Sequence, residues 1–188
     1  MEDKRECRNT GFKITAPDED KRTVEGYALL FDTPSDGLDF EEVIERGALD
    51  GVIEASDVFA LLNHSMSRGI LGRCTNGSGS LSLIVDNKGL KYRFEAPKTT
   101  LGDEILEGIR RGEIYQSSFS FSVKEDKWAK KENGTWKRNI IKIERLYDVS
   151  PVYNAAYSKT SVYTRGREAA EREMLKGYYE SFERQLNI

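Results

Sequence analysis

The run IYQSSFSFSV at residues 114–123 alternates serine with apolar residues, and this period of two constrains the fold more than any other feature of the chain. Successive side chains of a β-strand point to opposite faces. The predicted strand has a core-facing side and a polar side: Phe119, Phe121 and Val123 against Ser118, Ser120 and Ser122. Serine on the polar face of a half-buried strand is ordinary. A nucleophilic role for one of these serines therefore needs support from elsewhere in the chain.

Several other segments have the pattern of strands. Residues 23–31 (TVEGYALLF), 57–62 (DVFALL) and 139–150 (NIIKIERLYDVS) are rich in apolar, β-branched and aromatic residues, which favours strands. The turn sequences at residues 87–89 (NKG) and 133–134 (NG) each lie between two such segments. They predict hairpins, in which glycine supplies the positive φ of the turn. The sequence therefore predicts an α+β fold that is mainly β.

One segment between these strands has the period of a helix. Residues 96–114 read APKTTLGDEILEGIRRGEI, with Thr100 and Asp103 in an arrangement similar to a capping box and Gly112 after the last turn. Its apolar side chains recur at helical spacing: Leu101, Ile105, Leu106 and Ile109. A buried helix that ends two residues before the serine-containing strand would hold the start of that strand rigidly.

Length and composition fit one domain with tails. A chain of 188 residues with 38% hydrophobic content can bury one core. We expect a flexible N-terminus over residues 1–10, the folded domain over residues 11–164, and an amphipathic helical tail over residues 165–188. The apolar stripe of this tail consists of Leu175, Tyr178, Tyr179, Phe182 and Leu186.

Charge and cysteine content exclude several classes of protein. A net charge of −3 gives no overall field that would attract nucleic acid or acidic lipid. Cys7 and Cys74 are too few for a disulfide framework or a cysteine zinc site, which indicates a reducing cytosolic setting. The charged N-terminus does not resemble a signal peptide, and no apolar run reaches the length that spans a membrane.

His64, the single histidine, is the only imidazole base that the chain offers. A zinc site with two or three imidazole ligands is therefore excluded. Serine is a weak nucleophile until a base takes its proton, and that base works best when a carboxylate holds its tautomer. Asp148 in LYDVSPV, among apolar neighbours, is the candidate carboxylate. A structural histidine and a turn aspartate remain the ordinary alternatives for these two residues.

An ordered set of motifs carries a resemblance to a known family. The motifs are GYALLFD, LLNHS, ILGR, IVDNKGLKYRFEA, the helix ending IRRGEI, YQSSFSFSV and LYDVSPVYNAAY, and they span roughly residues 11 to 165. In this order and spacing they resemble the prohead proteases of tailed bacteriophages, of the kind that matures capsids of the HK97 type. The resemblance implies a serine endopeptidase with a fold similar to the herpesvirus assembly protease, a β-barrel with surrounding helices. It implies no cofactor or metal.

The family's functional residues carry over by motif to His64, Ser118 and Asp148, although many relatives have glutamate in place of the aspartate. Ser117 would face the phenylalanine side and is not the expected nucleophile. Acyl transfer then needs backbone amides that bind the oxyanion. We expect these near Gly72 in ILGR, where the neighbouring Arg73 has a salt bridge as its alternative role.

The resemblance also implies partners and a location. The partners are the major capsid protein with its scaffolding segment and the protease itself, with the portal protein and a homo-oligomer as further candidates. The protein would act in the host cytoplasm, in the interior of the prohead, without a membrane or a nucleic-acid partner. The tail at residues 165–188 is then a candidate targeting segment that the protease itself removes.

Three alternatives remain open at this stage. The basic and aromatic hairpin at residues 124–138 suits a module that binds single-stranded nucleic acid, although acidic residues within it oppose that function. A structural shell or scaffold protein would leave the three candidate catalytic residues unrelated. Cys74 could be a nucleophile, but a lone cysteine is more often a small buried hydrophobe.

Overall fold

The computed structural model describes residues 5–14, 22–35, 37–153 and 161–186. Its strands are β1 (Glu6–Lys13), β2 (Thr23–Leu30), β3 (Glu41–Ile44), β4 (Asp57–Ala60), β5 (Gly72–Thr75), β6 (Ser78–Gly79), β7 (Leu81–Val85), β8 (Gly89–Glu95), β9 (Gln116–Lys130) and β10 (Trp136–Val152). Its helices are α1 (Thr100–Arg110), α2 (Ser161–Leu186) and the short 3₁₀ helix η1 (Met66–Arg68). The predicted mainly β fold is confirmed.

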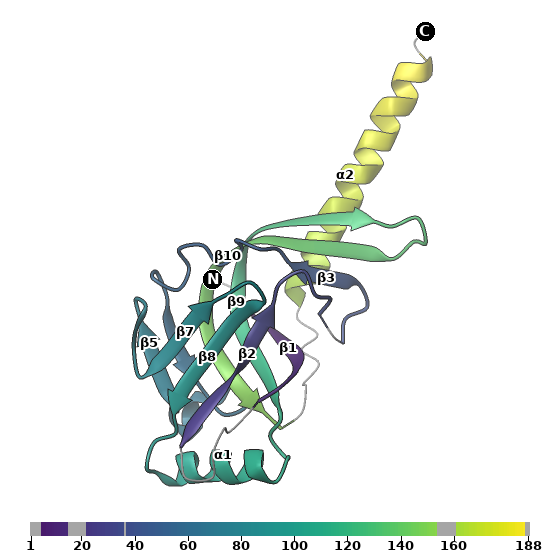
Figure 1. Cartoon of the computed structure of the whole chain (residues 1–188). Coiled ribbons are helices and arrows are strands. Elements are labelled where there is room, and N and C mark those ends of the chain that lie inside the picture. The colour runs from purple at the N-terminus through teal and green to yellow at the C-terminus, as the bar shows by residue number, and fades with distance from the viewer. Residues whose placement is uncertain (1–4, 15–21, 36, 154–160, 187–188) are drawn as a thin grey trace.

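The strands form two sheets. The larger sheet has the order β1-β9-β10-β4-β5-β6, with β3 also paired to β10, and the smaller has the order β2-β8-β7. β3 and β4 run parallel to β10, whereas the other pairs are antiparallel. Figure 1 shows the smaller sheet lying across one face of the larger one. Among the described residues, no hydrogen-bonded ladder joins the two sheets into the closed barrel that the resemblance implies.

The alternation along β9 is as predicted on its apolar side. Phe119 and Phe121 are buried in the main core, and Val123 packs against it. The serine side differs from an ordinary polar face, because Ser118, Ser120 and Ser122 are buried as well. β9 is therefore covered on both faces, and its buried hydroxyls need hydrogen-bond partners within the protein.

α1 holds the start of β9, as its position in the sequence predicts. The N–H groups of Glu113 and Ile114 both donate to the Gly108 carbonyl, at 2.8 and 3.0 Å, and Ile114 is fully buried. A Cβ on Gly108 would lie 2.5 Å from the end of the Ile114 side chain, so glycine allows this close approach without a shift of Ile114. The helix begins one residue from the predicted position. Its N-cap is Thr99, whose hydroxyl accepts the Gly102 N–H at 3.3 Å.

Both predicted hairpins are present, although the glycines act differently in them. In the β9–β10 turn Gly134 has a φ of 84°, as a turn glycine should. Gly89 at the end of the β7–β8 turn is not among the positive-φ residues. A Cβ there would lie 2.0 Å from the Leu29 carbonyl oxygen, so close approach to β2 explains this glycine instead.

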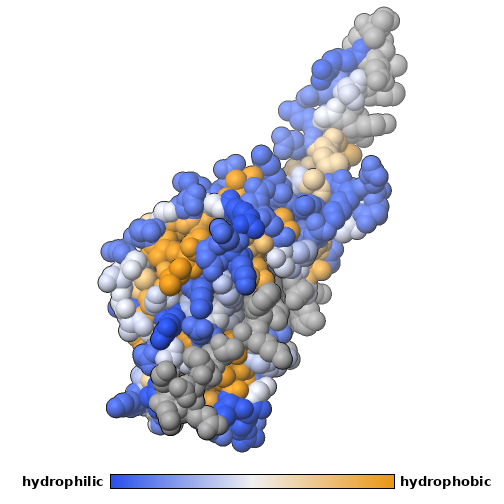
Figure 2. Space-filling model, in the orientation of Figure 1, coloured by the Kyte–Doolittle hydropathy of each residue, from blue (hydrophilic) through white to orange (hydrophobic). Residues whose placement is uncertain are grey.

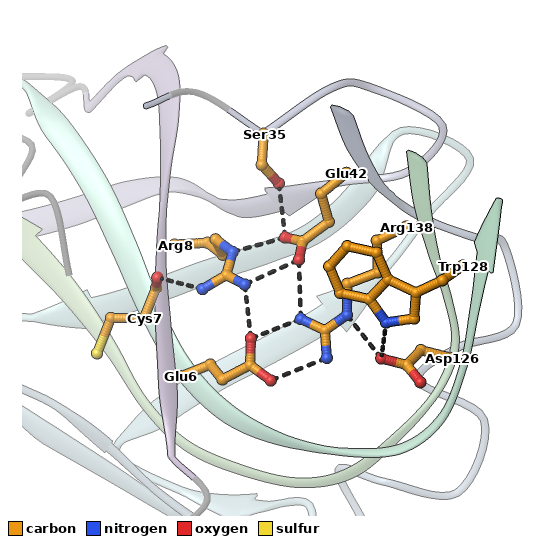
Figure 3. Close-up of polar contacts among 8 residues, drawn as sticks. All are labelled: Glu6, Cys7, Arg8, Ser35, Glu42, Asp126, Trp128 and Arg138. Atoms are coloured by element: carbon orange, nitrogen blue, oxygen red, sulfur yellow. Dashed lines mark hydrogen bonds and ion pairs between the residues drawn. The ribbon is translucent and has the colours of Figure 1, made fainter. Parts of the chain in front are cut away.

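β1 begins at Glu6, so it crosses the predicted boundary between residues 10 and 11. Two of its charged side chains, Glu6 and Arg8, are paired inside the protein (Figure 3). Arg8 contacts Glu6 at 2.5 Å and Glu42 of β3 at 2.6 Å, and Arg138 of β10 contacts the same two carboxylates at 2.7 and 3.0 Å. All four side chains are buried. This ion-pair cluster (Glu6, Arg8, Glu42 and Arg138) fixes β1 at the edge of the sheet. The sequence pattern alone predicts a flexible N-terminus for the first residues of this strand.

α2 extends away from the two sheets as an arm beside the end of the β9–β10 hairpin (Figure 1). On the face shown in Figure 2 its described residues are mostly hydrophilic, whereas apolar side chains gather over the body of the molecule. Within the described part of the chain, no helix is both long enough and apolar enough to cross a membrane.

Candidate active site

His64 lies at the end of a short segment that comes after β4 in the sequence and runs alongside β10. Beyond β4 the chain continues beside that strand, with the Leu61 N–H donating to the Val149 carbonyl at 3.2 Å and the Asn63 N–H to the Pro151 carbonyl at 2.9 Å. Asn63 and His64 then adopt positive φ values of 54° and 58°. Two successive non-glycine residues in this region are uncommon, and such backbone strain is concentrated at functional sites. The turn leaves the His64 side chain 24% exposed.

A bulge in the β9–β10 ladder sets the residues that face His64. The register shifts between Leu146 and Asp148, so Tyr147 has no partner residue on β9. On one side of this bulge Leu146 lies opposite Phe121 and joins the core. On the other side Asp148 lies opposite Ser120. The extra residue therefore lets Leu146 join the core while Asp148, two positions later, joins the polar face of β9.

The three predicted site residues lie within hydrogen-bond distance in one chain of contacts. His64 Nδ1 is 2.6 Å from Asp148 Oδ1, and His64 Nε2 is 2.6 Å from Ser118 Oγ. Ser118 Oγ also lies 2.9 Å from the Arg8 carbonyl oxygen of β1, and the residue is only 2% exposed. A serine hydroxyl has one proton, so Ser118 donates either to the imidazole or to this carbonyl.

The Asp148 side chain is buried, but its carboxylate is surrounded by hydrogen-bond donors. Its carboxylate accepts hydrogen bonds from His64, from Ser120 and, at 2.6 Å, from Ser150. Burial alone would raise the pKa of Asp148, but these hydrogen bonds outweigh it and hold this pKa below its ordinary value. An ionised carboxylate at this place can stabilise a positive charge on the imidazole.

Ser117 points to the other side of β9, as the alternation predicts. Its hydroxyl lies 2.8 Å from the buried Tyr92 hydroxyl. Burial raises the pKa of Tyr92, so this phenol is neutral in the physiological range. Ser117 therefore belongs to the core, away from His64.

The Arg73 amide, one of those expected near an oxyanion site, is engaged elsewhere. The Arg73 N–H donates to Ser80 Oγ at 3.1 Å, and its guanidinium pairs with Asp57 at 2.8 and 2.7 Å. These hydrogen bonds lower the pKa of Asp57 to about 2. The salt-bridge alternative describes Arg73 better than the oxyanion function.

Cys74 is buried, and burial raises the pKa of its thiol. A buried thiol with a raised pKa is a poor nucleophile, which weakens that alternative. No group of three or more His, Cys, Asp or Glu side chains that could hold a metal ion occurs in the described residues.

The sequence reasoning missed three contributors to this site: the Arg8 carbonyl, Ser120 and Ser150. A main-chain carbonyl has no sequence signature. The two serines did have a signal, since Ser120 shares a strand face with Ser118 and Ser150 shares one with Asp148. That spacing predicts proximity but does not identify the partner.

Comparisons with known proteins agree in part with the resemblance seen in the sequence. The model of a family described as caudovirus prohead serine protease matches residues 10–177. A solved structure, that of the bacteriophage T4 capsid assembly protease, is similar with a TM-score of 0.48 and 12% sequence identity, over 80% of this chain and 98% of that chain. Among curated proteins, none matches significantly.

Proposed function

Because this chain belongs to the caudovirus prohead serine protease family, it is a serine protease of capsid maturation, and we propose that His64, Ser118 and Asp148 are its catalytic triad. The observation that carries the proposal is the pair of 2.6 Å contacts made by the two ring nitrogens of the chain's single histidine. One nitrogen faces a hydroxyl and the other a buried carboxylate, which is the arrangement that activates a serine.

In the proposed mechanism Ser118 attacks the carbonyl carbon of a peptide bond while its proton passes to His64 Nε2. Asp148 accepts the Nδ1–H and stabilises the imidazolium that forms. The imidazolium then gives its proton to the leaving amine, and water repeats the sequence to release the acyl group. Before attack the Ser118 hydroxyl must donate to the imidazole and not to the Arg8 carbonyl.

The protease acts on capsid assembly proteins, and we propose its substrates more narrowly as the scaffolding part of the major capsid protein and the protease itself. The portal protein is a further candidate partner, and the enzyme is of the HK97 type with a fold similar to the herpesvirus assembly protease. Cleavage takes place inside the prohead, in the host cytoplasm.

The nucleic-acid alternative has less support than the protease. Arg138 of the hairpin at residues 124–138 is buried in the ion-pair cluster and contacts Asp126 at 2.7 Å. Trp128 packs against Phe40, with ring centroids 4.8 Å apart. Arg138 and Trp128 are therefore engaged within the protein, which weakens the case for a surface that stacks bases and binds phosphates.

The test of the triad is a comparison of Ser118→Ala with Ser117→Ala. Each variant is co-expressed with its capsid protein, and the cleavage products are identified by mass spectrometry. Ser118→Ala should keep the fold but lower turnover by about 10⁴- to 10⁶-fold, as other triad removals do. It should also abolish labelling by a fluorophosphonate, which reacts with activated serines.

Ser117→Ala is the matched control on the other face of β9. It should leave labelling and product formation close to wild type, at the cost of some stability because Tyr92 loses its buried partner. The reverse pattern would move the nucleophile to Ser117. Full activity of both variants would overturn the triad.

A further inference from the structure

Ser118 and Asp148, two of the three residues proposed for catalysis, belong to a square of four side chains on the β9–β10 ladder. Ser118 lies opposite Ser150, and Ser120 lies opposite Asp148, all four on the face that His64 covers. Each strand contributes two of these residues, which are two positions apart in the sequence and therefore point to the same face. Two members, Ser120 and Ser150, have no role in the mechanism described above.

We propose that Ser120 and Ser150 are positioning residues that aim the Asp148 carboxylate at His64. This inference rests on the proposed triad. Ser150 Oγ donates to Asp148 Oδ1 at 2.6 Å, the same oxygen that accepts from His64 Nδ1. Ser120 Oγ donates to the other oxygen, Oδ2.

The distribution of the donors fixes the plane of the carboxylate. A carboxylate turns about its bond to Cβ, and a contact to one oxygen alone leaves that rotation weakly restrained. Here each oxygen has a donor from a different strand, Ser120 on β9 and Ser150 on β10. The orientation in which Oδ1 faces His64 is therefore set by the sheet itself and is present before a substrate arrives.

Burial makes these two hydroxyls hard to replace. Ser120, Ser150 and Asp148 are all buried, so water has little access to take the place of a lost hydroxyl. Removal of either serine leaves an anionic oxygen short of a donor in a poorly solvated place. With one of its three donors gone, the carboxylate can rotate more freely about its bond to Cβ, and the Nδ1–H of His64 loses an acceptor that is held in place.

A changed carboxylate orientation has a chemical consequence at His64. The imidazole can accept the Ser118 proton at Nε2 only when its own proton is on Nδ1. Asp148 selects this tautomer by accepting the Nδ1–H. With Asp148 misaligned, the tautomer that carries its proton on Nε2 becomes populated, and this tautomer cannot act as the base.

The test uses the full chain with Ser120→Ala, Ser150→Ala and the double variant, and Ser122→Ala is the matched control. Ser122 is a buried serine on the same face of β9, but its hydroxyl lies 3.4 Å from that of Tyr147 and does not contact Asp148. The first measurement is the rate of labelling by a fluorophosphonate. The second is the ¹⁵N spectrum of the His64 ring, which needs no assignment because the chain has one histidine.

We expect each single variant of the pair to label about 10- to 100-fold more slowly than wild type, and the double variant more slowly still. The ¹⁵N shifts should move away from the Nδ1–H tautomer in the same order. Ser122→Ala should match wild type in both measurements. Ser120→Thr and Ser150→Thr, which keep the hydroxyl, should recover most of the labelling rate. An alanine variant that fails to fold is replaced by the cysteine variant, which keeps the volume and weakens the donor.

Labelling rates and ¹⁵N shifts of Ser120→Ala and Ser150→Ala that equal those of Ser122→Ala would overturn the inference. Asp148→Asn separates this failure from a failure of the triad. If Asp148→Asn labels slowly while the serine variants label normally, only the positioning role is wrong. If Asp148→Asn itself labels at the wild-type rate, the acid of the triad is wrong and the inference fails with it.

Discussion

Asp148 is the residue at which burial and hydrogen bonding oppose each other most directly. Its carboxylate is buried, which favours the neutral form, yet three donors favour the ionised form. The balance lowers the pKa of Asp148 in the folded protein. The folded state therefore binds this proton less readily than the unfolded state does, and stability becomes linked to pH.

The linkage predicts the pH dependence of stability at this residue. Because the folded pKa of Asp148 is depressed, its ionised form contributes stability above the ordinary aspartate value of about 3.9, and this contribution is lost as pH falls through the folded value. Wild type and Asp148→Asn are melted at several pH values between about 3 and 7. The wild type should be more stable near neutral pH, and the difference in Tm should shrink as the pH falls below about 4.

The use of a difference between two proteins removes the contributions of the other carboxylates, which titrate equally in both. A gap that widens as the pH falls from about 5 to about 3, where aspartates titrate, would mean that burial dominates and that the Asp148 carboxyl is neutral in the folded state. That outcome would also contradict its role as the partner of a cationic imidazole.

The sequence predicted the three residues that we propose for catalysis, but it did not predict the groups that form hydrogen bonds with them. His64 followed from elimination, since no other histidine exists. The contact between Ser120 and Asp148 depends on the register shift at Tyr147, which has no local signal. The salt bridge of Arg73 was one of two alternatives, because its partner Asp57 lies on the neighbouring strand and pairs with it only in the folded sheet.

At the scale of elements, the ion-pair cluster predicts which single charge the fold depends on. Arg138→Met removes one cation and leaves Glu6 and Glu42 buried with one partner between them. Unfolding in urea should show a loss of about 3 to 5 kcal/mol, because the cost of an unpaired buried charge is large. The loss should fall mainly on β1 and its ladder with β9.

Arg73→Met is the control for this prediction. The Arg73–Asp57 pair has the same kind of contact, at 2.7 Å, but its side chains are partly exposed. Such pairs contribute about 0 to 1 kcal/mol because water already solvates both charges. Equal losses in the two variants would show that the buried cluster is no more important than a surface ion pair.

The elements that the sequence predicted well are those with a local pattern. The apolar stripe at residues 101–109 correctly predicted α1, and the turn sequences correctly predicted both hairpins. β1 was missed because its charges are typical of an exposed tail. The partners that bury these charges lie up to 132 residues away in the sequence, beyond the reach of any local pattern.

At the scale of the whole molecule, the described residues form a body of two sheets with an arm. α2 begins at Ser161, four residues before the predicted tail, and its described side chains are mainly exposed. Met174 and Leu175 are 49% and 51% exposed. The remaining predicted stripe residues lie outside the described side chains: Tyr178, Tyr179, Phe182 and Leu186. We propose that this arm directs the protease into the assembling shell and is later removed by the protease.

An exposed helix that serves a partner should be dispensable for the body and required for assembly. A variant that ends at Thr160 lacks α2. Its Tm should lie within about 3 °C of the full chain, because the described side chains of α2 are mainly exposed and about 1 kcal/mol shifts the Tm of a chain this size by 2 to 4 °C. It should still react with a fluorophosphonate, since the site residues precede the helix. Purified proheads from cells that express it should contain much less protease.

The full-length double variant Met174→Ser, Leu175→Ser separates the helix from its apolar surface. It keeps α2 but removes two exposed apolar side chains that have no buried role. If the arm binds a partner through these side chains, this variant should also be depleted from proheads, with the Tm and labelling rate of wild type. A large fall in Tm on truncation, with normal incorporation of both variants, would make α2 part of the folded body and would rule out the targeting function.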